Sequence, residues 1–149
     1  MFVSTRELIF FRVAGHRPWY VSAGSGDICT VCQDAFASIF QEYSVDLVLT
    51  GHFHVYERNA PILNGAADPN ELNNPSGTWY ISNGAAGHYD GLDNLVTPLQ
   101  SYSRYAQDTA YGWSRLIFHN CTHFTQEFVA SANGSVLDTA TLYKDRKCY

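Results

Sequence analysis

An apolar run that ends in glycine and histidine decides the fold of this chain: VDLVLTGHFH, residues 45–54. The run is short and strongly apolar, which predicts a buried strand that stops at Gly51. Just upstream, apolar side chains recur at the i, i+3, i+4 and i+7 spacing of one helix face, so a helix is expected over residues 33–43. A further apolar stretch predicts a strand over residues 8–14. Strand, helix and strand in this order form a βαβ unit, whose two strands run parallel.

Two histidines follow the predicted strands at equivalent positions. His16 comes after Gly15 at the end of the first strand, and His52 comes after Gly51 at the end of the second. Because parallel strands end at the same edge of a sheet, these side chains are expected to converge there, where open α/β sheets bind their ligands. His54 lies two residues beyond His52, and in an extended segment this spacing points both side chains to one side.

Glycine and imidazole at this edge predict a metal site. Gly51 is expected to permit a sharp turn and a close approach of the backbone. Neutral imidazole is a common protein ligand for zinc and iron, so His16, His52 and His54 are the candidate ligands. The alternative, an ordinary surface pair of histidines, is disfavoured because the strand–glycine–histidine arrangement occurs twice.

The rest of the chain is rich in predicted strands. Residues 59–74 contain Pro and Asn-Gly and residues 90–109 are polar, which predicts loops and irregular structure. A strand is expected over residues 78–82. Three more strands, with Asn133-Gly134 as the hairpin turn between the last two, predict an antiparallel meander. These three strands cover residues 113–119, 124–130 and 136–143.

The predicted fold class is therefore α/β, with a βαβ unit followed by an antiparallel β meander. A chain of 149 residues has the length of one domain. Within that domain, residues 1–58 are expected to carry the βαβ unit and the histidine turns. Residues 59–149 are expected to form a β-rich segment of the same domain.

Composition excludes several classes of protein. The net charge is −5 and no basic stripe is present, which argues against nucleic acid as a partner. No apolar run approaches the roughly 20 residues of a membrane span. Residues 8–11 are too few for the apolar part of a secretory leader, which needs about 7–15 residues.

Cysteines and glycosylation signals nevertheless indicate an extracellular or secreted protein. The acceptor pattern occurs at Asn120 and at Asn133. Four cysteines allow three pairings, of which Cys29 with Cys32 and Cys121 with Cys148 is favoured by spacing. The second bridge would stabilise the fold by roughly 3–4 kcal/mol in the chain-entropy description. A redox role for the Cys29-x-x-Cys32 motif, which precedes the predicted helix, is the alternative.

Two segments resemble the signatures of a known enzyme family. GHFHVYER, residues 51–58, resembles the GHxHxYER signature of the purple acid phosphatases, which are calcineurin-like metallophosphoesterases. VAGH, residues 13–16, resembles their VxxH motif, and the two motifs occur in the family order. Residues 111–112, 120–123 and 141–147 resemble the C-terminal segment of the family.

This resemblance implies a fold, a metal centre and a reaction. The fold would be a four-layer α/β/β/α sandwich, of which this chain supplies about half. His16 and His52 would bind a divalent metal (Zn, Mn or Fe), and His54 would bind iron. The dinuclear centre would hydrolyse phosphate monoesters under acidic conditions.

The sequence also departs from the family pattern. The motifs GDxG, GDxxY and GNHE, which supply the carboxylate, Tyr and Asn ligands, do not occur before Val13. Residues 21–26 replace the substrate-facing histidines that several members carry. Without the carboxylates, two cations within about 4 Å would repel each other strongly. The chain by itself is therefore expected to bind one divalent metal weakly at most and to have little activity. The alternative function is a secreted, catalytically incomplete module for metal binding or interaction.

Several residues near the motifs have more than one possible role. Trp19 and Tyr20 would either line a substrate cleft or cover the edge of the sheet. His88, in a glycine-rich loop, would either reach the metal edge or remain an exposed loop residue. The segment 56–58, which is Tyr56, Glu57 and Arg58, is expected to brace the metal turn, with Arg58 paired to an acidic neighbour.

Overall fold

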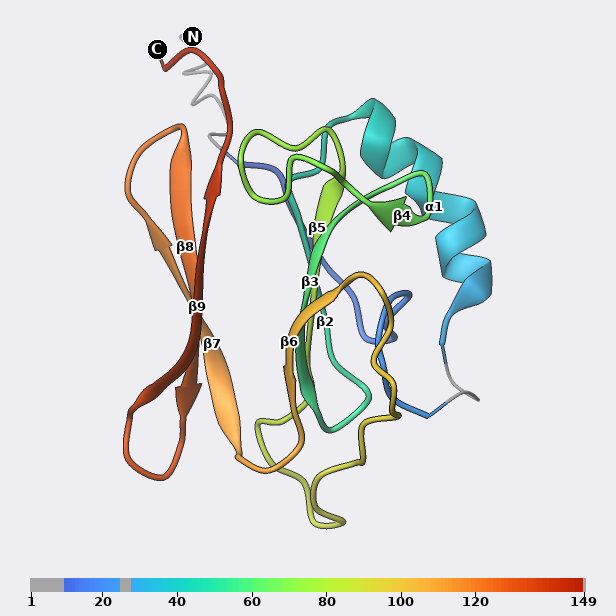
Figure 1. The fold of residues 1–149 in the computed structure, drawn as a ribbon, viewed down its shortest axis with the longest axis vertical. Coiled ribbons are helices and arrows are strands. Elements are labelled where there is room, and N and C mark those ends of the chain that lie inside the picture. Colours follow the sequence, from blue (N-terminus) through green and yellow to red (C-terminus); the bar gives the residue numbers. More distant parts are fainter. Residues whose placement is uncertain (1–9, 25–27, 149) are drawn as a thin grey trace, which may run out of the picture.

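Two β-sheets and one helix form three layers in this computed structural model, which describes residues 10–24 and 28–148 (Figure 1). The larger sheet lies in the middle, with helix α1 (Thr30–Glu42) on one face and a three-stranded sheet on the other. The predicted α/β class is therefore confirmed, and the chain supplies an α/β/β part of the expected sandwich. The expected strand at residues 8–14 begins outside the described residues, and its described part is β1 (Arg12–Ala14).

The larger sheet combines parallel and antiparallel strands. Its order is β1-β2-β5-β3-β4, and β6 pairs with β3 beside β4. β1, β2 and β5 run parallel, so β1, α1 and β2 form the predicted βαβ unit. β3 runs antiparallel to its three neighbours. The strands after β1 are β2 (Leu47–Thr50), β3 (Tyr56–Leu63), β4 (Ala66–Ala67), β5 (Thr78–Asn83) and β6 (Ser103–Gln107).

Strand β3 extends further than the sequence indicates. It continues to Leu63 through Pro61, so the prediction of a loop from residue 59 is wrong for its first five positions. Proline is tolerated here because the register with β5 shifts between Arg58 and Pro61, and proline in sheets is confined to edges and such irregularities. The strand also crosses residue 58, where the first expected segment ends. The predicted irregular stretch 90–109 likewise contains β6.

Helix α1 begins three residues before its predicted start. The Sγ atom of Cys29 accepts a hydrogen bond from the backbone N–H of Cys32 at 3.2 Å and so caps the helix. The same two cysteines form a disulfide. On the face toward the sheet, Phe40 stacks on Trp19, with ring centroids 5.1 Å apart.

No helix within the described residues has the length and apolar character that a bilayer crossing requires.

The smaller sheet is the predicted antiparallel meander. It consists of β7 (Gly112–Phe118), β8 (His123–Ala130) and β9 (Val136–Tyr143), within one residue of the expected bounds. The main core lies between the two sheets. In β2 and β5, alternate residues face this core and the core beneath α1, as expected for strands covered on both faces. The buried members of the core between the sheets are Phe10, Leu47, Tyr56, Trp79, Ile81, Ala85, Phe124, Phe128 and Leu142.

Hydrogen bonds connect the C-terminal segment to the residue that precedes β2. Asp46 is buried, and its Oδ1 atom accepts a hydrogen bond from Nη2 of Arg146 at 2.5 Å across 100 residues of sequence. The Oδ2 atom of the same carboxylate accepts a hydrogen bond from the backbone N–H of Phe11 at 2.9 Å. A disulfide between Cys121 and Cys148 fixes the last residues to the β7–β8 hairpin.

Candidate metal site

The two parallel strands bring His16 and His52 together at one edge of the larger sheet. The backbone N–H of Gly15 donates to the carbonyl of Leu49 at 2.9 Å, and that of Gly51 donates to the carbonyl of His16 at 3.0 Å. These bonds extend the β1–β2 pairing just past both strands. As a result, Nε2 of His16 lies 3.1 Å from Nδ1 of His52, and the rings meet edge to face.

The backbone of the turn does not use glycine in the way that the sequence suggests. Positive φ occurs at His52, with a value of 70°, whereas Gly51 is not in the left-handed region. A Cβ atom on Gly51 would come no closer than 3.7 Å to Asn83 O, which is ordinary contact. The expectation that Gly51 provides the sharp turn and the close approach is therefore wrong.

The close approach is made instead by Gly84, just after β5. Its N–H donates to the carbonyl of Val55 at 3.1 Å, so the loop after β5 lies directly against the turn. A Cβ atom on Gly84 would lie 2.0 Å from the carbonyl oxygen of Phe53. Only glycine fits at this position, because a side chain would displace the segment that carries His52 and His54.

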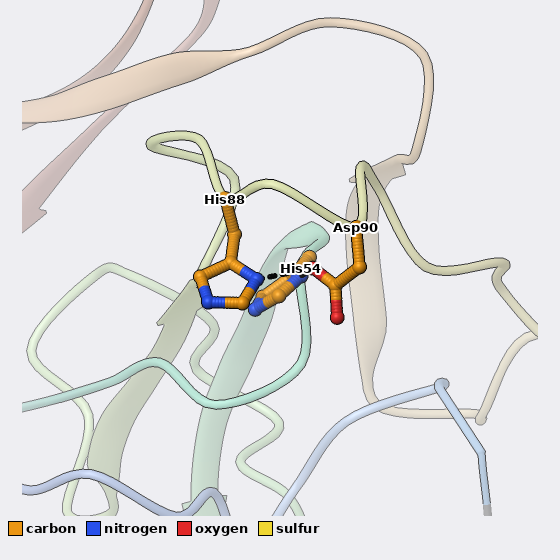
Figure 2. A group of neighbouring side chains, drawn as sticks. All are labelled: His54, His88 and Asp90. Carbon is orange, nitrogen blue, oxygen red and sulfur yellow. Dashed lines mark hydrogen bonds and ion pairs between the residues drawn. The ribbon is translucent and has the colours of Figure 1, made fainter.

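His54 pairs with a different part of the chain from His52. Its ring lies 4.9 Å from the ring of His88, measured between centroids, and its Nδ1 atom lies 3.4 Å from Oδ1 of Asp90. Figure 2 shows the side chains of His54, His88 and Asp90 converging from the turn and from the glycine-rich loop. A hydrogen bond from His88 to Asp90 holds the pKa of this carboxyl below its usual value.

The prediction that His52 and His54 point to one side assumed an extended backbone. That assumption does not hold, because φ is positive at His52. Both side chains nevertheless line one open pocket of roughly 480 Å³. Residues from the ends of β1 and β2 form one side of this pocket, and the loop after β5 forms the other. The lining residues are His16, His52, Phe53, His54, His88, Asp90 and Asp93.

Sequence reasoning missed the two carboxylates of this pocket. Asp93 accepts a hydrogen bond from the backbone N–H of His54 at 2.7 Å and so fixes the end of the turn. Asp90 lies two residues beyond His88, and this His-x-Asp spacing between glycines was the available signal. His88 lines this pocket while its side chain stays half exposed, and its role at a metal stays a prediction.

Hydrogen bonds behind the pocket connect it to the rest of the fold. Glu57 is fully buried, and its Oε1 atom accepts from the Ser22 hydroxyl at 2.7 Å. Arg58 donates from Nε and Nη2 to the carboxylate of Asp138 on β9. The Tyr56 hydroxyl donates to the same carboxylate at 2.7 Å, and burial raises the pKa of this tyrosine above its usual range. The segment 56–58 thus links the turn both to the loop before α1 and to the smaller sheet.

Trp19 and Tyr20 are buried beneath α1 and do not line this pocket. Trp19 packs between Phe40 and Tyr80, and the Tyr20 hydroxyl accepts a hydrogen bond from Gln33 Nε2 at 2.7 Å. Burial raises the pKa of Tyr20. Of their two possible roles, covering the sheet is the one that agrees with this burial.

Comparison with known proteins agrees with the fold and with the resemblance to purple acid phosphatases. Residues 77–139 match the family model described as iron/zinc purple acid phosphatase-like protein C. Acid phosphatase A of Cryphonectria parasitica is 39% identical over 132 residues, which cover 89% of this chain and 26% of that protein. Acid phosphatase type 7 of Danio rerio is 32% identical over 152 residues, which cover 89% of this chain and 34% of that protein.

The chain matches the C-terminal region of a purple acid phosphatase. A solved structure of the purple acid phosphatase from yellow lupin (Lupinus luteus) seeds superposes with a TM-score of 0.85. The match covers 96% of this chain and 26% of the lupin chain, and at 24% identity it establishes the shared fold alone. The chain thus spans about a quarter to a third of the length of these three proteins.

Proposed function

We propose that this chain provides histidine ligands of a metal centre that hydrolyses phosphate monoesters, with His16, His52 and His54 as those ligands. The observation that carries the proposal is the 3.1 Å approach of the His16 and His52 ring nitrogens at the ends of two parallel strands. The Cryphonectria parasitica and Danio rerio relatives are acid phosphatases by name, and they supply the reaction class. The proposed substrate is therefore a phosphate monoester.

The donor atoms of the pocket fit one divalent ion. Two imidazole nitrogens already in contact need only to open around a cation to become a pair of ligands, and zinc and iron accept such ligands. When bound, metal ions at such a centre polarise a phosphate oxygen and lower the pKa of a bound water. The proposed metals are iron with zinc, manganese or a second iron, as the family resemblance implies.

A second adjacent ion would find few negative ligands in this pocket. Among the described residues that line it, the carboxylates are Asp90 and Asp93, and Asp93 is already engaged with the backbone of His54. Two cations about 4 Å apart repel each other strongly unless carboxylates offset their charge. We therefore expect the chain alone to bind one metal weakly and to hydrolyse phosphate esters slowly.

The decisive experiment measures metal content and turnover on the same protein. The purified chain is loaded with Zn²⁺ and Fe, its metal is counted by mass spectrometry, and hydrolysis of p-nitrophenyl phosphate is followed at acidic pH. His52→Ala should reduce the metal content. His119→Ala is the matched control, because this histidine bonds Thr125 in the smaller sheet and does not line the pocket. Because His88 and Asp90 offer further ligand atoms beside His54, the two proteins are also compared with His88→Ala in both, and equal metal content there would overturn the ligand assignment.

A catalytically incomplete module for metal binding or interaction is the second candidate function, favoured by the small number of carboxylates in the pocket. The same experiment separates the two. Metal binding without turnover supports the module, whereas turnover at an ordinary enzymatic rate supports the hydrolase. The two disulfides and the acceptor sites at Asn120 and Asn133 support secretion in either case.

A further inference from the structure

We propose that His54, His88 and Asp90 form a divalent-metal site of their own, which we call the loop site, suited to a Zn²⁺-class ion. The loop site takes His54, which the proposed function also uses, but requires neither His16 nor His52. Because a neutral imidazole offers one lone pair, an ion in the loop site and an ion bound by His16, His52 and His54 exclude each other. Its ligands come from the turn after β2 and from the loop after β5 (Figure 2). It therefore assigns His88 and Asp90 a role that the histidine signature at residues 51–58 does not include.

Distances between the three side chains are close to those that a zinc ion needs. One ligand atom from each residue lies within 4.8 Å of the other two. Zinc binds nitrogen and oxygen ligands at about 2.0–2.2 Å, so ligand atoms around a tetrahedral ion lie roughly 3.3 Å apart. Closing this gap needs a small movement of the side chains. The side chains of His88 and Asp90 are half exposed, so they have room to make it.

The hydrogen bond of His54 prepares the ring for metal binding. Its Nδ1 atom lies 3.0 Å from the carbonyl oxygen of Gly91, an acceptor, so this nitrogen carries the hydrogen. Nε2 is then left with the lone pair that binds a metal. A backbone carbonyl that fixes the tautomer in this way is a usual outer partner of a metal-binding histidine.

The loop is shaped to bring His88 and Asp90 over His54. Gly87 and Gly91 flank the segment with φ values of 122° and 88°, which only glycine adopts readily. The N–H of Gly91 donates to the carbonyl of His88 at 3.1 Å and closes a turn between them. The Tyr89 side chain between the two candidate ligands is almost fully exposed, so the loop is not held by burying it.

The chemistry of the donor set also selects the ion. Two imidazoles and one carboxylate leave a fourth position for water, which is the arrangement of zinc sites with three protein ligands. The carboxylate of Asp90 offsets one of the two positive charges. Nitrogen donors favour zinc and its transition-metal neighbours over Mg²⁺ or Ca²⁺, which prefer oxygen ligands.

Titration calorimetry with Zn²⁺ near neutral pH tests the loop site. His88→Ala and Asp90→Asn should each weaken Zn²⁺ binding by more than about 10-fold, the lower end of what loss of even an outer partner costs. His16→Ala should leave this binding event in place. The matched controls are His119→Ala for the loss of an imidazole and Asp34→Asn, on the exposed side of α1, for the loss of a charge.

The outcomes for the two sites are distinguishable. If His88→Ala and Asp90→Asn bind Zn²⁺ as tightly as wild type, the loop site is overturned, and a loss in His16→Ala would then support the proposed function alone. A second measurement follows modification of His88 by diethyl pyrocarbonate in the His16→Ala/His52→Ala variant. Protection of His88 by Zn²⁺ in that variant supports the loop site, and modification at the same rate with and without Zn²⁺ overturns it.

Discussion

Arg58 of β3 holds Asp138 of β9 through two hydrogen bonds, from Nε to Oδ2 at 2.7 Å and from Nη2 to Oδ1 at 2.9 Å. Both side chains are largely buried, and the Tyr56 hydroxyl donates to the same carboxylate. The pair therefore joins the two sheets four residues beyond His54. Planar, two-point contacts of this kind are the strong form of ion pair.

Removing the carboxylate should destabilise the whole fold. We expect Asp138→Ala to lower the free energy of unfolding by roughly 3–5 kcal/mol, because Arg58 would keep its charge without a partner in a buried place. Denaturant unfolding followed by circular dichroism measures this change. Glu127→Ala is the control: it breaks the more exposed Arg115–Glu127 pair and should cost less than about 1 kcal/mol. Equal effects of the two substitutions would contradict the role given to Asp138.

Substitution by alanine should affect stability very differently at two glycines near the turn. Gly84→Ala places a Cβ atom against the carbonyl of Phe53 and should cost about 1–3 kcal/mol, the usual penalty of overpacking. It should also weaken metal binding, since the displaced segment carries His52 and His54. Gly51→Ala meets only ordinary contacts and should be nearly neutral in both measurements. Thermal unfolding and metal titration of the two variants test this contrast, and a larger effect at Gly51 would refute it.

Buried tyrosines should make the fold sensitive to alkali. Burial raises the pKa of Tyr102 to about 12 and raises those of Tyr56 and Tyr80 further. Above pH 10, where tyrosines of the unfolded chain lose their protons, the folded chain keeps these protons. Stability is therefore fully present below about pH 10 and is lost as the pH rises toward 12. Tyrosine ultraviolet absorbance should rise in two phases, the second together with loss of circular dichroism; a single phase with intact structure would count against this.

Both glycosylation acceptors should be modified when the protein is made in a eukaryotic secretory system. Asn120 and Asn133 are exposed and lie in the two hairpins of the smaller sheet, away from the metal pocket. Intact-mass measurement should show one glycan lost in each of Asn120→Gln and Asn133→Gln. Asn120→Gln should also reduce stability, because its Oδ1 atom accepts hydrogen bonds from the backbone N–H groups of Thr122 and His123. An unchanged mass for either variant would show that the substituted asparagine carries no glycan.

Much of the fold follows from local pattern. The meander strands alternate in burial along much of their length, and Asn133-Gly134 lies between the last two, so their bounds were predictable to within a residue. The histidine edge was predictable as well, because β1 and β2 are parallel and each ends at a glycine followed by histidine. These features depend on residues that are close together in the sequence or on a general rule of sheet topology.

Features that depend on distant partners were not predictable. The continuation of β3 through Pro61 depends on a shift in register with β5, and β6 forms only because β3 offers it an edge. Asp90 reaches the pocket because the loop after β5 folds back over the turn. The acidic partner of Arg58 lies 80 residues further along the chain, and no local pattern identifies it.

Ion pairs between residues far apart in the sequence also determine when this chain can finish folding. Strand β3, which follows the turn at residues 51–54, gains its ion pair with the smaller sheet only once Asp138 is available to Arg58, and Asp46 at the start of β2 gains its arginine partner only with Arg146. Such pairings across 80 and 100 residues are slow to form, because most of the intervening chain must be ordered first. During synthesis, the histidines therefore leave the ribosome well before β9, which carries the partner of Arg58. Until β9 emerges, the apolar faces of β2, β3 and β5 are exposed to chaperones and to aggregation.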